Sequence, residues 1–283
     1  MPIGAHVSTA GGLSTSIGRA QALGAECMQI FLSAPRRLQH PKHSDEEVAA
    51  FKTLLAEAAI APAFAHATYL INLASDDPGL RQASIANLCA SGEWCDRVGL
   101  AGIVVHVGSG RTQRVEDAVR QVASALAQVL DHGSVSGVLL ENSAGSGDTL
   151  GARFEQIGSL FDQLGRDPRL GLCLDTAHTF ASGYDLRVDD GIERALDEIE
   201  QFMGLDRLRL IHANDSKVDL GSAVDRHENI GHGVLGEDAF VRMLAHPKLR
   251  DLPWILEVPG LDGKGPDLPN VQTLKRLAGR PVD

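Results

Sequence analysis

The chain has 283 residues, of which 43% are hydrophobic, and its formal net charge is −11. This composition excludes a disordered chain, and the lack of any apolar run near the ~18 residues of a membrane span excludes a transmembrane helix. The acidic balance argues against broad, salt-driven attraction to a polyanion, so any nucleic-acid site must be local.

A short apolar run, a polar loop and an amphipathic stretch recur along the chain, and no linker divides it. The apolar runs predict eight strands, at Ile3–His6, Glu26–Phe31, Ala61–His66, Gly102–His106, Gly137–Glu141, Leu170–Asp175, Arg207–His212 and Trp254–Glu257. The amphipathic stretches predict helices at Ser44–Ala59, Ser84–Val98, Glu116–Leu130, Phe154–Leu164, Gly191–Met203 and Glu237–Leu244. In the first of these, Ser44 followed by Glu47 three residues later is typical of a helix N-terminus.

Eight units of strand and helix in a chain of this length favour one fold class. We predict an α/β fold in which residues 1–283 form a single-domain (β/α)₈ TIM barrel. An open, doubly wound parallel sheet is the competing arrangement.

Seven of the eight predicted strands end in a residue type that binds metals. These are His6, His66, His106, Glu141, Asp175, His212 and Glu257. A parallel barrel brings the C-terminal ends of its strands to one face, where the active sites of such barrels lie. Taken singly, each residue is more easily explained as an ordinary hydrogen-bonding group. Together they predict a metal cluster at this face, because buried carboxylates and imidazoles need cations to compensate them.

The segments after two of these strands add further residues of the same types. Asp175 is followed by His178, and both side chains face the barrel mouth if the chain turns into a loop or helix there. Asp225 and His227 are two residues apart. This spacing directs both side chains the same way from an extended segment and suits one shared metal.

An aromatic and an aliphatic residue, Tyr69 and Leu70, follow His66 in a predicted loop. Chains usually bury such residues, so they could pack beneath the loop. If exposed, they could instead act as a wedge. The sequence leaves both interpretations open.

Other features of the sequence restrict the expected cellular compartment and the possible cofactors. The four cysteines form no C-x-x-C pair, which predicts free, buried thiols. The first residues lack the pattern of a secretory signal, so we expect a cytoplasmic protein. No G-x-x-x-x-G-K-[ST] or G-x-G-x-x-G fingerprint follows a strand, and we therefore expect no nucleotide cofactor.

Three sequence blocks occur together and in order. They are H-x-x-Y-L-I-N-L from His66, G-L-C-L-D-T-A-H from Gly171, and H-x-N-D-S-K from His212 with D-R-H and I-G-x-G after it. In this combination the chain resembles the endonuclease IV family, the zinc-dependent apurinic/apyrimidinic endonucleases of base-excision repair. The resemblance runs from Gly4 to Glu257, and it implies a (β/α)₈ barrel that holds three zinc ions.

The resemblance also implies a role for individual residues. The implied zinc ligands are His66 and His106 on one ion, Glu141 bridging it to a second, Asp175, His212 and Glu257 on that second ion, and His178, Asp225 and His227 on the third. The implied catalytic residues are Glu141 and Glu257, and the implied DNA contacts are Arg36, Tyr69 and Leu70. Three zinc ions outweigh the four ligand carboxylates, so the barrel mouth would attract a phosphodiester despite the acidic surface.

The activity implied by the resemblance is hydrolysis of the phosphodiester bond 5′ to an abasic site in double-stranded DNA. The products are a 3′-hydroxyl and a 5′-deoxyribose phosphate, and removal of 3′-blocking groups is expected as well. The resemblance further implies a monomer.

The chain departs from the family pattern at three positions. Leu38 stands where relatives more often have an aromatic residue, Val107 where they have proline, and His232 where an acidic residue is frequent. None of the three is an implied metal ligand. We expect Leu38 to affect the details of the DNA-binding loops and Val107 to affect only the stiffness of its loop. His232 could add a pH-dependent contact or have no effect.

Two other functions compete with this one. Sugar isomerases and epimerases resembling xylose isomerase hold one or two ions with a similar set of ligands, and Glu141, Asp175, His212 and Glu257 alone would suit them. The additional histidines and Asp225 favour the nuclease. A non-catalytic metal protein is disfavoured because closed structural zinc sites prefer cysteine-rich tetrahedra.

Overall fold

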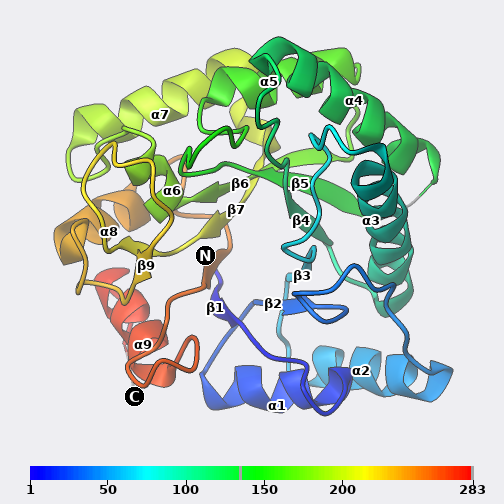
Figure 1. The fold of residues 1–283 in the computed structure, drawn as a ribbon. Coiled ribbons are helices and arrows are strands. Elements are labelled where there is room, and N and C mark those ends of the chain that lie inside the picture. Colours follow the sequence, from blue (N-terminus) through cyan, green and yellow to red (C-terminus); the bar gives the residue numbers. More distant parts are fainter. Residues whose placement is uncertain (134–135, 282–283) are drawn as a thin grey trace.

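The computed structural model describes residues 1–133 and 136–281, and within them eight parallel strands close into a barrel (Figure 1). The barrel strands are β1 (Ile3–His6), β2 (Met28–Phe31), β3 (Ala63–His66), β4 (Gly102–His106), β5 (Gly137–Glu141), β6 (Leu170–Asp175), β7 (Leu208–His212) and β10 (Trp254–Leu256). Their order around the barrel is β1-β10-β7-β6-β5-β4-β3-β2. The predicted TIM barrel is therefore confirmed, and the open sheet is excluded.

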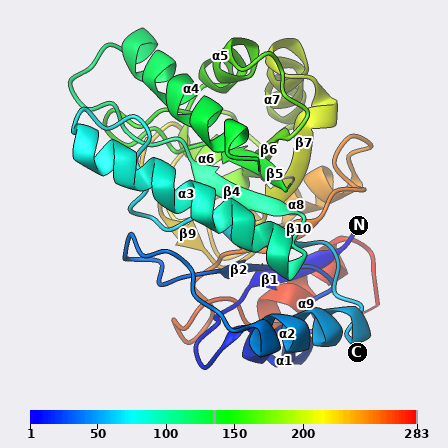
Figure 2. The ribbon, with the colours of Figure 1, turned by 90° about the vertical axis from the view of Figure 1, so that its right-hand side faces the viewer.

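Helices surround the barrel, and α3 and α4 lie side by side on its outside (Figure 2). Their bounds are α1 (Leu13–Ala22), α2 (Asp45–Glu57), α3 (Pro78–Val98), α4 (Val115–Asp131), α5 (Phe154–Gln163), α6 (Thr176–Ala181), α7 (Asp189–Phe202), α8 (Gly236–Ala245) and α9 (Leu268–Leu277). A short 3-10 helix, η1 (Leu205–Arg207), precedes β7, and a two-stranded hairpin, β8 (Asp215–Ser216) with β9 (His227–Glu228), follows it. No helix in the described ranges is long and apolar enough to cross a membrane.

Several element bounds differ from the predictions. Strands β2 and β3 each begin two residues later than predicted, and Glu257 lies just beyond β10. Helix α3 begins at Pro78, because the Asp77 side chain accepts hydrogen bonds from the first-turn N–H groups and proline fits that turn. Helices α1 and α9 and the β8–β9 hairpin were not predicted.

Helix α1 shows why the local sequence pattern does not predict every helix. Its N-cap is Gly12, which offers no side chain, and the Leu13 N–H donates instead to Glu47 Oε1 at 2.7 Å. Ser44 caps α2 as predicted, with its hydroxyl accepting from the Glu47 N–H. The Glu47 carboxylate thus stabilises the start of α1, 34 residues away in the sequence, and the two helices are joined by this contact.

The barrel interior contains two layers of side chains. The lower layer is apolar and consists of Cys27, Phe64, Val104, Leu139, Cys173, Leu210 and Ile255. Strand β1 contributes Gly4 at this level, where a Cβ atom would lie 1.7 Å from the Cys27 carbonyl oxygen. Because side chains alternate along a strand, the residue two positions later points inward too, nearer the C-terminal mouth. The upper layer is polar and consists of His6, Gln29, His66, His106, Glu141, Asp175, His212 and Glu257.

The four cysteines are free, as predicted. Cys27, Cys95 and Cys173 are buried, whereas Cys89 is half-buried rather than buried. Burial raises the pKa of the Cys95 thiol well above its ordinary value, which keeps that thiol protonated and unreactive.

Glu26 joins the start of the barrel to the C-terminal segment. Its carboxylate accepts hydrogen bonds from the Ile3 N–H and from Arg280, and it pairs with Lys275 of α9 at 3.1 Å. Partial burial raises the pKa of Glu26, but these contacts outweigh burial and lower it to about 2. The contribution to stability is therefore fully present above pH 4.5 and is lost as the pH falls toward 2.

We expect Glu26→Gln to lower the free energy of unfolding by about 1 kcal/mol at pH 7, a value reduced for the partial exposure of the carboxylate. The difference between the two proteins should shrink at pH 3. Urea unfolding at pH 7, 5 and 3 measures it. An equal destabilisation at all three pH values would show that packing, and not charge, is what the substitution removes.

Candidate metal centre

The C-terminal mouth of the barrel brings all the implied metal ligands together. Six come from the polar upper layer, and His178, Asp225 and His227 come from α6 and the hairpin region. The described residues form three groups whose ligand atoms lie within 4.8 Å of one another: His66, His106 and Glu141; Glu141, Asp175, His212 and Glu257; and Asp175, His178 and His227. Residues far apart in the sequence thus share one site.

Glu141, at the end of β5, lies between the first two groups. Its Oε2 atom is 3.1 Å from His66 Nε2 and 3.2 Å from His106 Nε2. Its Oε1 atom is 3.1 Å from His212 Nδ1. The two oxygens of one buried carboxylate therefore face two different sets of imidazoles, which is the geometry of a bridging ligand.

The second group adds Glu257 and Asp175. Glu257 Oε2 is 3.2 Å from His212 Nδ1, on the same side as Glu141 Oε1. Asp175 is fully buried, and its Oδ2 accepts a hydrogen bond from Asn214 at 2.6 Å. The predicted strand β6 places Asp175 here because it is the last residue of that strand.

The third group is built by a helix and a hairpin. Asp175 is the N-cap of α6 and accepts from the His178 N–H, so His178 follows one turn later. Strand β9 supplies His227, whose Nε2 is 3.4 Å from His178 Nε2. Asp225 Oδ1 is 3.2 Å from His178 Nε2 and 3.3 Å from His227 Nε2. The spacing of Asp225 and His227 does bring both side chains to one point.

Hydrogen bonds on the far side of two histidine rings leave unprotonated ring nitrogens facing this site. His66 Nδ1 donates to the Ala67 carbonyl at 2.6 Å, and His178 Nδ1 donates to the Asn142 carbonyl at 3.0 Å. Because a neutral imidazole carries one proton, the Nε2 atoms of both rings are bare. His178 Nε2 and His227 Nε2 then face each other beside a carboxylate oxygen, an arrangement that needs a shared proton or a cation. The donor set fits bound metal.

The pKa shifts of the ligands also indicate that this site needs positive charge. Burial raises the pKa of Glu141, but His106 and His212 outweigh it and hold that pKa well below the ordinary value. Burial lowers the pKa of His178, yet the charge of Asp175 and the other nearby carboxylates raise it to about 10. The pKa values of Glu141, Asp225 and Glu257 are all lowered, so these carboxylates stay ionised. The pKa values of His66, His178 and His212 are raised, so without metal these imidazoles hold protons more readily, whereas burial lowers the pKa of His106.

Two residues of the upper layer were not assigned as ligands from the sequence, and the structure places both against the cluster. His6 ends strand β1, and its Nδ1 is 2.8 Å from Glu257 Oε1. No motif in the sequence points to Gln29. It is fully buried and contacts both Glu257 and His212. The only feature of the sequence that could have indicated Gln29 is that it is the one polar residue within the apolar strand Met28–Phe31.

The implied DNA-contact residues lie on two loops that are joined together. The Tyr69 N–H donates to the Pro35 carbonyl at 3.0 Å, and the Thr68 hydroxyl donates to the same oxygen. Arg36 is exposed, and Tyr69 and Leu70 are 58% and 46% exposed. These exposures exclude burial beneath the loop as the role of Tyr69 and Leu70.

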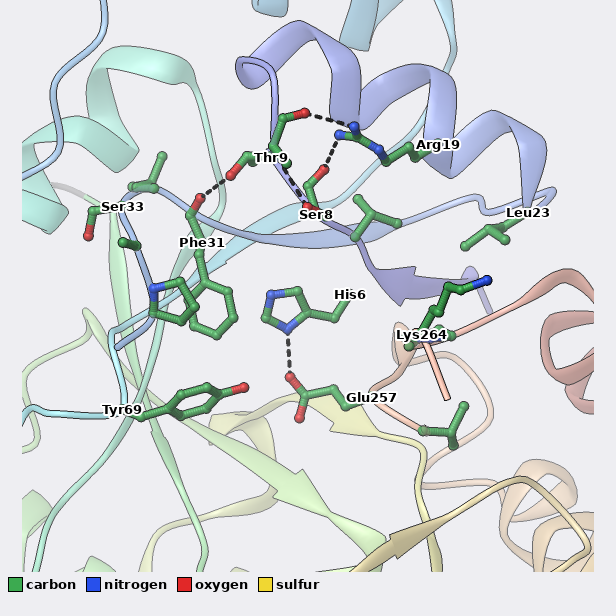
Figure 3. A pocket seen from close by; sticks show the side chains of 18 of the residues that line it. His6, Ser8, Thr9, Arg19, Leu23, Phe31, Ser33, Tyr69, Glu257 and Lys264 are labelled. Atoms are coloured by element: carbon green, nitrogen blue, oxygen red, sulfur yellow. Dashed lines mark hydrogen bonds and ion pairs between the residues drawn. The ribbon is translucent and has the colours of Figure 1, made fainter. Parts of the chain in front are cut away.

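A cavity of about 1080 Å³ opens beside the cluster. Phe31 and Tyr69 line one side of it and Lys264 lines the other, with the hydrogen-bonded pair of His6 and Glu257 between them (Figure 3). The polar upper layer thus borders a space large enough for a nucleotide-sized group.

The three departures from the family pattern lie outside the ligand groups. Leu38 packs against the hydrophobic core as a partly buried side chain. Val107 is buried directly after β4, and His232 is exposed in the turn before α8.

Comparisons with known proteins agree on one relationship. A family model described as a xylose isomerase-like TIM barrel matches residues 17–277. A probable endonuclease 4 of Chloroflexus aurantiacus is 39% identical over 97% of both chains, and one of Nitratidesulfovibrio vulgaris is 40% identical over 99% of this chain and 100% of its own. The crystal structure of endonuclease IV from Thermus thermophilus matches with a TM-score of 0.86 at 34% identity, covering 99% of both chains. A D-tagatose 3-epimerase-like protein shares the fold, with a TM-score of 0.72 at 17% identity over 99% of this chain and 97% of its own.

Proposed function

This chain belongs to the endonuclease IV family, and from that membership we propose that it hydrolyses the phosphodiester bond 5′ to abasic sites in double-stranded DNA. It is an endonuclease and not a sugar isomerase, because the relatives at 39% and 40% identity are named as probable endonucleases and the structure at 34% identity is an endonuclease IV, whereas the epimerase-like structure shares 17% identity and the fold alone. The proposed products are a 3′-hydroxyl and a 5′-deoxyribose phosphate. We also propose that the protein acts as a monomer and that it removes 3′-blocking groups.

The observation that carries this proposal is the number of ligand groups. The group around His212 and Glu257 alone would suit a sugar isomerase with one or two ions. The groups around His66 and His178 would have no use in such an enzyme. In phosphodiester hydrolysis, the attacking oxygen, the phosphate and the departing oxygen each gain from a nearby cation.

We propose that the groups hold three zinc ions. Each group contains an imidazole, and two of the three groups contain two; such sites select zinc-like ions, whereas Mg²⁺ prefers oxygen and water. When bound, the ions would lower the pKa of a water so that it acts as the nucleophile, and they would stabilise the departing 3′ oxygen.

The chain's own residues then have distinct tasks. Glu141 joins two ligand groups and sets the distance between them, and Glu257 completes the second group, so we assign both as catalytic residues. Asp175 and His178 link the second and third groups through the first turn of α6. The apolar layer below excludes water from the underside of the site.

We assign Arg36, Tyr69 and Leu70 to the DNA. Their exposure on two joined loops at the barrel mouth suits side chains that fill the gap when the abasic nucleotide leaves the stack. Extrusion is least costly where a base is already missing, which favours abasic sites over intact DNA.

The test is incision of duplex DNA that carries one tetrahydrofuran abasic analogue, with the purified protein and no added Mg²⁺. The analogue cannot undergo β-elimination, so cleavage must be hydrolytic. We expect cleavage on its 5′ side, leaving a 3′ end that a polymerase extends, and no cleavage of the matched undamaged duplex. Absence of cleavage by folded protein loaded with zinc would contradict the proposal.

A further inference from the structure

Gln29 lies in the same inward-facing layer as the metal ligands, although it is not itself a ligand type for zinc. Gln29 of β2 lies directly above Cys27 of the apolar layer, just as His66 of the neighbouring strand β3 lies above Phe64. The Gln29 side chain faces the cluster and is fully buried from solvent. A buried amide must satisfy its hydrogen bonds within the protein.

The two ends of the Gln29 amide contact two ligands of the same group. Its Nε2 donates to Glu257 Oε1 at 2.7 Å, and its Oε1 accepts from His212 Nε2 at 3.0 Å. The orientation of the amide is fixed, because reversing it would place an amide oxygen against the carboxylate. Since an amide oxygen only accepts, His212 Nε2 carries the proton and His212 Nδ1 is free for an ion.

His6 supplies a second hydrogen bond to the same carboxylate oxygen. Its Nδ1 donates to Glu257 Oε1 at 2.8 Å, a contact visible in Figure 3. The same Nδ1 atom also lies 3.0 Å from Gln29 Nε2, whereas His6 Nε2 is buried and has no hydrogen-bond partner within the described residues. A proton on Nδ1 has the Glu257 carboxylate as its acceptor, but a proton on Nε2 would be buried without one, so we place the ring proton on Nδ1. Two donors therefore converge on Oε1, and Glu257 Oε2 is left facing His212 Nδ1 at 3.2 Å.

We propose that Gln29 and His6 are positioning residues that commit Glu257 to bind its ion through Oε2 and His212 to bind it through Nδ1. This inference rests on the metal centre of the proposed function. Outer hydrogen bonds of this kind orient ligands, and removing one typically costs about 10- to 100-fold in metal affinity. The effect should be confined to the ion of the Glu257 group, because neither residue contacts the ligands of the third group.

The test compares zinc release from purified, zinc-loaded protein into a chromogenic chelator, which requires no DNA. We expect Gln29→Met, which keeps the volume but loses both hydrogen bonds, to release one ion about 10- to 100-fold faster while the others leave at the wild-type rate. Gln29→Glu should release it faster still, since it sets a second carboxylate against Glu257. With cobalt in place of zinc, the visible absorption bands should shift in the same variants.

His6 provides an independent pair of variants, which tests the proposal if Gln29→Met does not fold. His6→Asn keeps a donor near the Nδ1 position and should retain the slow release, whereas His6→Ala should not. Gln121→Met is the matched control, because the Gln121 amide donates to the Ser75 carbonyl and touches no ligand.

Wild-type release rates in both Gln29→Met and His6→Ala would overturn the proposal. Equal acceleration of all ions would overturn it too, because that pattern indicates a loosened barrel. The proposed function can fail separately: wild-type protein that does not incise the abasic analogue, but shows the expected release pattern, would refute the nuclease assignment and leave these two roles intact.

Discussion

Glu141→Gln is expected to reduce kcat/KM for incision of the abasic analogue by at least about 1000-fold and to reduce the zinc content. The carboxylate is 1% exposed, and its two oxygens face imidazoles of two different ligand groups. An amide of the same shape removes one negative charge and turns an NH₂ group toward one of those groups. The substitution therefore weakens the only side chain that joins His66 and His106 to His212 among the described contacts.

Incision kinetics and elemental analysis of the same preparation measure this prediction. Glu57→Gln serves as a matched control, because Glu57 is exposed at the end of α2, far from the barrel mouth. Activity and metal content at wild-type levels in Glu141→Gln would refute the bridging role.

Removal of the metal by prolonged chelation is expected to abolish incision and to lower the melting temperature by roughly 10 °C. The reason is that buried carboxylates at the barrel mouth lose the cations that compensate them, and histidines such as His178 must carry protons instead. Readdition of zinc, and not of Mg²⁺, should restore both properties. Thermal unfolding and incision assays before and after readdition measure the two effects.

Zinc rebinding should also release protons. Without metal the pKa of His178 is about 10, so this side chain carries a proton at pH 7 that an ion must displace. Calorimetry in buffers of different ionisation enthalpy detects that release. Binding without proton release would show that the imidazole is not a ligand.

The sequence predicted which strand-end side chains lie at the barrel mouth, because one rule governs their positions. A strand residue and the one two positions later point the same way, so the ends of the apolar runs reveal which side chains enter the barrel. His106, Glu141 and Asp175 each end a strand whose bounds were predicted without error. Glu257 is the one exception in position, since it follows β10 instead of ending it.

Residues whose roles depend on distant partners could not be predicted in this way. Gln29 sits inside an apolar run, and nothing in that run indicates that its two partners lie on β7 and after β10. The start of α1 depends on Glu47, and the exposure of Tyr69 depends on the loop that contains Pro35. Such contacts join segments separated by tens to hundreds of residues, which periodicity does not report.

The apolar layer beneath the cluster determines the route by which ions and water enter and leave the barrel. Phe64, Val104 and the other residues of that layer close the barrel from below, so ions and water exchange with solvent through the C-terminal mouth. In the proposed function, DNA docks over the same opening. A bound substrate would therefore act as a cover that keeps the ions in place during the reaction, and the enzyme would be most easily stripped of metal between one encounter with DNA and the next.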